Sequence, residues 1–125
     1  MKIYTSYFGN LAKLKKAGII PISISLWPPK FYSGLKMPFL APDKTYIHWP
    51  EKTYTPEYQK KLSHLDAKYV LQEIIKLSGG KDVALCCYEK PGEFCHRRLI
   101  AEWLTKETGK PIEEFNQIKE TVELF

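Results

Sequence analysis

The sequence predicts a small α/β fold, a three-layer sandwich with a mostly parallel, Rossmann-like sheet. Strand-like and helical patterns alternate along the 125 residues, as they do in parallel α/β folds. The segment 82–88 is almost continuously apolar, which is typical of a central strand buried on both faces. Hydrophobic residues make up 44% of the chain, enough for a core. We expect residues 1–125 to form one α/β domain.

Two strands and one helix are predicted at the N-terminus. Residues 3–5 have a short strand pattern, and residues 11–17 have a helical one that ends at Gly18, a residue suited to a left-handed helix cap. Residues 21–27 alternate apolar and small polar side chains, which favours a second strand. The prolines at 28–29 end it.

Residues 28–54 form a long stretch without regular periodicity. It holds five of the nine prolines and six of the seventeen aromatic residues. Such long irregular segments are usually binding loops or lids, and the alternative is a packed loop that covers a sheet edge. Because it follows a strand, we expect this loop to form one wall of a crevice at the carboxyl end of the sheet.

A long helix is predicted next. Thr55 is a suitable N-cap and Pro56 suits the first helical position, so the helix is expected to begin there. Its apolar stripe runs to Leu77, with a restart near Asp66. After the strand 82–88, a second clear helix is predicted over 95–108. The tail 112–125 fits either a helix or a short strand near its start.

Net charge is unevenly distributed. The chain carries +5 overall, but residues 1–52 carry eight lysines and two acids, whereas the remainder holds eleven basic and twelve acidic residues. A basic N-terminal half suggests an anionic partner such as a nucleotide or nucleic acid. The alternative is that scattered lysines only keep the protein soluble.

Cysteine usage and hydropathy suggest a cytoplasmic protein without a membrane partner. No stretch approaches the roughly 20 apolar residues of a membrane helix, and the N-terminus lacks a signal-peptide pattern. The chain has three cysteines, an odd number, and Cys86 and Cys87 are adjacent, which disfavours a disulfide framework. We therefore expect Cys87 and Cys95 to be reduced.

Chemically versatile residues gather where the strand 82–88 meets the next helix. Cys87 and Glu89 are two residues apart, so both point to the same side at the strand tip. Cys95, His96 and Arg97 occupy the first turn of the following helix, where free N–H groups and basic side chains suit an anion. The helix dipole and neighbouring cations favour a thiolate, so Cys95 is expected to be the most reactive cysteine.

Structural roles are the alternative for each of these residues, for example Cys87 as a core residue and His96 as a half-buried histidine. A zinc site is a further alternative, with Cys87, Cys95 and His96 as ligands. The eight-residue gap between the cysteines is not a known knuckle spacing, and His48 or His64 would have to supply the fourth ligand. The sequence therefore predicts no metal and no cofactor.

The motif from Cys87 to Arg97 reads Cys-x-Glu, five residues, Cys-His-Arg. It resembles the signature of a prokaryotic and phage family, domain of unknown function 488, and the flanking strand and helix look similar too. The resemblance implies a small α/β fold. It also implies a site built from these residues: Cys87, Glu89, Cys95, His96 and Arg97.

Two segments differ from the pattern expected of this family. An Asp and an Arg are expected along the second strand, but Ser23 and Ser25 stand there, just before Trp27. A glycine-histidine-serine turn after the first strand corresponds here to a segment that begins at Ser6. The chain thus resembles a divergent branch. The residues assigned to substrate binding are Arg97, Cys87, Ser6, Ser23, Ser25 and Trp27.

The leading functional prediction is an enzyme that acts on a small anionic or nucleotide-like substrate. The substrate would bind at the N-terminus of the helix that starts near Cys95. Cys95, Glu89 and His96 are assigned to catalysis, as in a cysteine-, glutamate- and histidine-dependent hydrolase or transferase. The alternative is a non-catalytic module that binds a nucleotide or nucleic acid through the basic half and the aromatic loop.

Overall fold

The computed structural model describes residues 1–89 and 95–115. Within them, five parallel strands form one sheet in the order β3-β2-β4-β1-β5. The strands are β1 (Ile3–Tyr7), β2 (Ile20–Ser23), β3 (Leu35–Lys36), β4 (Val83–Cys87) and β5 (Ile112–Glu114). The predicted Rossmann-like α/β sandwich is confirmed.

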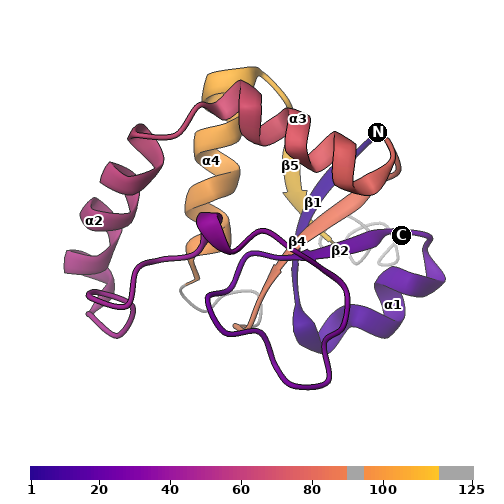
Figure 1. Cartoon of the computed structure of the whole chain (residues 1–125), viewed down its shortest axis with the longest axis horizontal. Helices are drawn as coiled ribbons and strands as arrows, with labels where there is room; N and C mark the ends of the chain where they lie inside the picture. Colours follow the sequence, from indigo (N-terminus) through magenta and orange to yellow (C-terminus); the bar gives the residue numbers. More distant parts are fainter. Residues whose placement is uncertain (90–94, 116–125) are drawn as a thin grey trace, which may run out of the picture.

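Helices cover both faces of this sheet. The α-helices are α1 (Leu11–Lys16), α2 (Glu51–Ser63), α3 (Ala67–Ser78) and α4 (His96–Thr108). Two short 3₁₀ helices are η1 (Phe8–Asn10) and η2 (Pro38–Leu40). Figure 1 shows α2, α3 and α4 on one side of the sheet and α1 on the other. None of the helices in the described part of the chain is both long and apolar enough to cross a membrane.

Strand β4 is the centre of the molecule. All five of its residues are buried, and it pairs with β1 on one edge and β2 on the other. Leu85 belongs to the core beneath α2, α3 and α4, whereas Cys86 belongs to the smaller core beneath α1. Because side chains alternate along a strand, Cys86 and Cys87 point to opposite faces of the sheet.

Helix α2 begins one turn before the predicted start. Its first residue is Glu51, so Thr55 is not the N-cap and Pro56 lies inside the helix. The extra turn buries Tyr54 on the same face as Tyr58, so core packing outweighs the local proline preference. The restart near Asp66 is confirmed, since this side chain accepts hydrogen bonds from the first N–H groups of α3.

Two other boundaries differ from the prediction. Strand β2 ends at Ser23 rather than at 27, and the short strand β3 inside the 28–54 loop was not predicted. The Ser23 carbonyl accepts a hydrogen bond from Met37 N at 2.8 Å, so the loop returns to the sheet edge. In the tail, 112–114 is a strand. Residues 116–125 of the tail and residues 90–94 lie outside the described residues.

Candidate functional site

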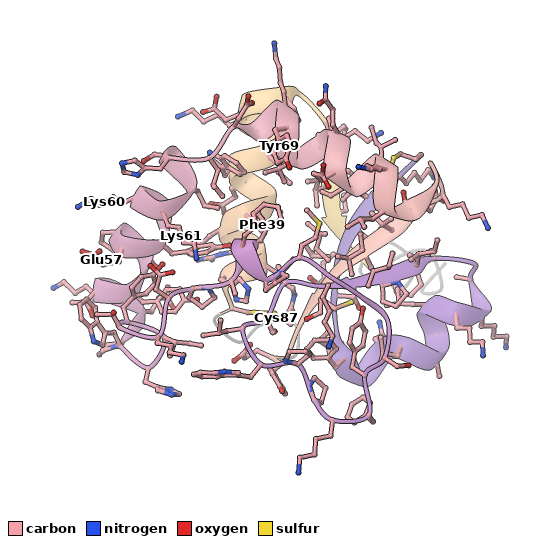
Figure 2. All side chains as sticks on the ribbon, viewed as in Figure 1. Phe39, Glu57, Lys60, Lys61, Tyr69 and Cys87 are labelled. Carbon is pink, nitrogen blue, oxygen red and sulfur yellow. A yellow bond between two sulfur atoms is a disulfide. The ribbon has the colours of Figure 1, made fainter. Side chains whose placement is uncertain are left out.

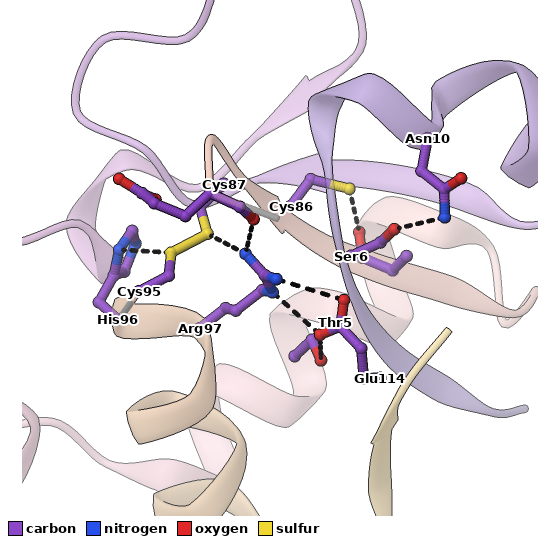
Figure 3. A network of polar contacts seen from close by, with 11 residues as sticks. Thr5, Ser6, Asn10, Cys86, Cys87, Cys95, His96, Arg97 and Glu114 are labelled. Carbon is purple, nitrogen blue, oxygen red and sulfur yellow. Dashed lines mark hydrogen bonds and ion pairs between the residues drawn. A yellow bond between two sulfur atoms is a disulfide. The ribbon is translucent and has the colours of Figure 1, made fainter. Parts of the chain in front are cut away.

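The two motif cysteines meet beyond the carboxyl end of β4. Cys87 is the last residue of β4, and Cys95 is the N-cap of α4. The structure joins them by a disulfide, with Cα atoms 7.2 Å apart (Figure 3). The prediction that both thiols are free is therefore wrong. The end of β4 and the start of α4 bring the two sulfur atoms together. The eight-residue spacing in the sequence does not by itself reveal this contact.

Arg97 lies behind this pair rather than in solvent. Only 4% of it is exposed, and its guanidinium forms an ion pair with Glu114 of β5 at 2.9 Å. Its Nη1 donates to Cys87 Sγ at 2.9 Å and to the Glu89 carbonyl oxygen at 2.5 Å. Figure 3 shows these contacts, with Thr5 Oγ1 donating to the same Glu114 carboxylate at 2.7 Å. The side chain therefore ties α4, β4 and β5 together.

His96 is buried on the other side of Cys95. Its Nε2 lies 2.7 Å from the Ile24 carbonyl oxygen, and its Nδ1 lies 3.7 Å from Cys95 Sγ. A carbonyl can only accept, so Nε2 carries the proton and Nδ1 presents a lone pair to the sulfur in the neutral ring. Burial, partly opposed by the Ile24 hydrogen bond, lowers the pKa of His96 to about 4. The ring is therefore neutral at physiological pH.

A pocket of about 150 Å³ opens in front of Cys95 and His96. Its residues come from the segments just after β2 and β4, from the 28–54 loop, from the first turn of α2 and from the start of α4. They are Ser25, Trp27, Pro42, Ile47, Trp49, Tyr54, Tyr88, Glu89, Cys95 and His96. The participation of Pro42, Ile47 and Trp49 confirms that the loop forms one wall of the crevice beside Glu89. A larger groove between α2, α3 and α4, about 470 Å³, holds none of the predicted site residues.

The predicted site residues fall into three groups. Five line the pocket: Ser25, Trp27, Glu89, Cys95 and His96. Cys87 and Arg97 lie behind it, joined by their hydrogen bond. Ser6 and Ser23 are both in register with Cys86, so they point toward the α1 face and not into the pocket.

Three contributors to the site were missed. Glu114 and Thr5 complete the Arg97 network, and the Ile24 carbonyl sets the tautomer of His96. A glutamate in a tail that fits either a helix or a strand has no pattern that links it to Arg97. The contact with Ile24 uses a backbone carbonyl, which every residue type has, so the sequence does not indicate it.

The resemblance of the Cys87–Arg97 motif to domain of unknown function 488 is supported by a family-model match. The family model for DUF488-N3a, described as the active DUF488-N3 subclade, matches residues 25–108, which is more than half of the chain. The chain belongs to the DUF488 family. No curated protein and no solved structure matches it.

The part of the chain that matches DUF488 contains the whole pocket. It begins at Ser25, just after β2, and ends with the last residue of α4. Every pocket residue and both motif cysteines fall inside this span. Ser6, Ser23 and Glu114 fall outside it. At the pocket and directly behind it, the DUF488 span places the sulfur atoms of Cys87 and Cys95, the His96 imidazole, the Glu89 carboxylate and the Arg97 guanidinium.

Proposed function

We propose that this DUF488 protein is an enzyme that acts on a small anionic or nucleotide-like substrate in the pocket. In its reduced form Cys95 is the nucleophile, His96 accepts the thiol proton, and Glu89 is a second acid or base. The observation that carries the proposal is that all three line one pocket with aromatic walls. The description of the matched subclade as active supports a catalytic role.

The walls of the pocket suit a planar ring. Trp27, Trp49 and Tyr54 all line it, and aromatic side chains stack on nucleobase-like groups. Lys44 Nζ lies 6.0 Å from the centre of the Trp27 ring, so a cation stands beside the pocket. A ligand with a flat ring and an anionic tail would match both features.

The chemistry assigned to Cys95 follows from its neighbours. His96 Nδ1 faces the sulfur at 3.7 Å and carries the ring's lone pair, because Nε2 donates to the Ile24 carbonyl oxygen. Arg97 is assigned a different role from the one expected from sequence. Its guanidinium is buried and donates to Glu114, Cys87 and the Glu89 carbonyl oxygen, so we assign it to positioning Cys87 rather than to binding substrate.

Binding can be tested by tryptophan fluorescence. Nucleosides and nucleotides titrated into the full chain should quench emission, and Trp49→Phe should weaken both quenching and affinity. Trp103→Phe is the matched control, because Trp103 lines the groove between the helices instead. Lys44→Ala should weaken the binding of phosphorylated ligands by about twofold to fivefold relative to Lys36→Ala, and it should leave the binding of uncharged nucleosides unchanged. Equal weakening in the Trp49 and Trp103 variants would contradict the pocket assignment.

Catalysis can be tested by turnover of the same compounds with reduced protein. Cys95→Ser should abolish product formation, and Cys86→Ala should retain it because Cys86 faces the α1 core. Mild alkylation followed by peptide mapping should label Cys95 first, since burial raises the pKa of Cys86 to about 12. A cytoplasmic location, as predicted from sequence, would supply the thiol reductants that keep Cys95 active. Saturable binding without turnover would favour the alternative, a nucleotide-binding module.

A further inference from the structure

Three potential metal ligands lie together at the end of β4. The sulfur atoms of Cys87 and Cys95 and a ring nitrogen of His96 lie within 4.8 Å of one another, and all three residues are buried. Two sulfurs and one imidazole form a donor set that zinc and other soft divalent cations prefer. Neither of the other two histidines belongs to this cluster.

The imidazole is already oriented for coordination. His96 Nε2 donates to the Ile24 carbonyl oxygen, so the lone pair is on Nδ1, the atom that faces Cys95 Sγ. Histidine ligands in metal sites commonly donate their second ring N–H to a backbone carbonyl in this way, which fixes tautomer and ring angle. The Tyr58 ring packs edge-on against the His96 ring, with the ring centres 5.4 Å apart, and restricts the rotation of the imidazole.

The distances fit a tetrahedral ion. Metal–sulfur bonds of about 2.3 Å and metal–nitrogen bonds of about 2.0 Å imply a sulfur–nitrogen separation of about 3.5 Å at the tetrahedral angle. Cys95 Sγ and His96 Nδ1 are 3.7 Å apart. The two sulfurs would have to separate to about 3.8 Å. Their Cα atoms, 7.2 Å apart, already leave room for this.

The surrounding charges also suit a bound dication. Two thiolates balance a divalent ion, and His96 is neutral. Arg97 is balanced by Glu114 at 2.9 Å, so its positive charge is offset. The Arg97 N–H that now points at Cys87 Sγ would stabilise a metal-bound thiolate by a charge-assisted hydrogen bond.

We propose that the reduced protein binds one Zn²⁺-class cation through Cys87 Sγ, Cys95 Sγ and His96 Nδ1, with the fourth position toward the pocket. Two molecules of a small thiol first reduce the disulfide and are oxidised to their own disulfide. The cation then forms two metal–sulfur bonds and one metal–nitrogen bond, and both thiol protons pass to solvent. This inference does not rest on the proposed enzymatic function.

The disulfide and the metal site exclude each other, because both use the same two sulfur atoms. Oxidation therefore ejects the cation, and bound cation protects the thiols from oxidation and alkylation. The pair has three states: disulfide, free dithiol and metal complex. Only the free dithiol leaves Cys95 available as a nucleophile.

Metal binding is tested on the full chain without substrate. Protein reduced with a phosphine, which is then removed under nitrogen, is titrated with Zn²⁺ against a chromophoric chelator. One equivalent should bind, and disulfide-bonded protein should bind none at this site. Titration with Co²⁺ should give thiolate-to-metal charge-transfer absorption and the visible bands of a tetrahedral ion.

Three variants identify the ligands. Cys87→Ser, Cys95→Ser and His96→Gln should each weaken binding by at least about tenfold, whereas Cys86→Ala should bind like wild type. Absence of stoichiometric binding to reduced wild type would overturn the proposal, as would a cobalt spectrum without thiolate bands. The wild-type spectra decide the question even where a variant fails to fold. Metal binding without turnover would contradict only the enzyme proposal. Turnover without metal binding would contradict only the proposal of a metal site.

Discussion

Arg97 shows how a charged residue becomes part of a core. It is buried at the first turn of α4, where a cation would ordinarily remain in water. Burial is tolerable because Glu114 supplies the opposite charge and because the Cys87 sulfur and the Glu89 carbonyl accept two further hydrogen bonds. Arg97 is therefore enclosed by the protein, although the sequence assigned it to substrate binding.

Arg97→Ala should lower the free energy of unfolding by about 3 kcal/mol or more, because it leaves the half-buried Glu114 carboxylate without its partner. Urea unfolding at neutral pH measures the effect. Arg98→Ala is the control: Arg98 is largely exposed, and its contacts with acids are 3.9 and 4.0 Å long, so a change near zero is expected. Equal stability of the two variants would mean that the buried ion pair contributes nothing.

His96 should make the protein sensitive to mild acid. In the native state its pKa is about 4, and the ordinary value is 6.5. Between these values the unfolded chain binds a proton that the folded chain does not, so stability is complete above about pH 6.5 and falls as pH decreases toward 4. The loss from this residue between pH 7 and pH 5 should be about 2 kcal/mol.

The measurement is urea unfolding of disulfide-bonded protein in the presence of a chelator, at pH 7 and at pH 5. His96→Gln removes the titrating group, so it should lose most of the difference between the two pH values. A variant with the same pH dependence as wild type would show that another group causes the loss.

At the scale of elements, the 28–54 loop is held in place by α2. Lys61 Nζ donates to the Ala41 carbonyl oxygen at 2.6 Å and to Asp43 Oδ1 at 2.7 Å, and Figure 2 shows Lys61 directed from α2 toward the loop. Tyr58 adds a hydrogen bond from its hydroxyl to the Leu40 carbonyl oxygen at 2.5 Å. These contacts set the position of the pocket wall that includes Pro42.

Lys61→Met should therefore loosen the loop without unfolding the protein. The loss of both hydrogen bonds that Lys61 donates, together about 1–1.5 kcal/mol at this partly exposed position, should increase trypsin cleavage after the exposed Lys44 by roughly fivefold to tenfold. Lys60→Met is the matched control, since it removes the neighbouring lysine, which is exposed. Mass mapping of the first fragments identifies the cut. Equal cleavage in both variants would mean that Lys61 does not restrain the loop.

Local pattern explains which elements could be predicted from sequence. The apolar run of β4 and the apolar stripe of α4 are properties of short segments, so both were predicted within one or two residues. The start of α2 was not, because the burial of Tyr54 against the core is a tertiary effect that outweighs Thr55 and Pro56. The closeness of the motif residues could be predicted for a related reason, because they lie on one strand tip and one helix start.

At the scale of the whole molecule, the disulfide joins the central strand to the helix that follows it, eight residues along the chain. Loop-closure entropy for so short a separation predicts a stabilisation of about 2.5 kcal/mol. Reduction in the presence of a chelator should lower the free energy of unfolding by this amount in wild type and in Cys86→Ala. The stability of Cys87→Ser should not change on reduction. If reduction lowered its free energy of unfolding as much as that of wild type, the assignment of the effect to the Cys87–Cys95 disulfide would be contradicted.

The strand order has a consequence for synthesis. Strands β1 and β2 are not neighbours, because β4 lies between them and pairs with both. During translation the first 82 residues leave the ribosome before this shared partner exists. At about 5–20 residues per second, β1 waits several seconds with unpaired edges, which is the condition in which nascent chains associate with one another or with chaperones. The ribosome therefore releases β4, the central strand of the sheet, only after most of the chain that packs around it has emerged.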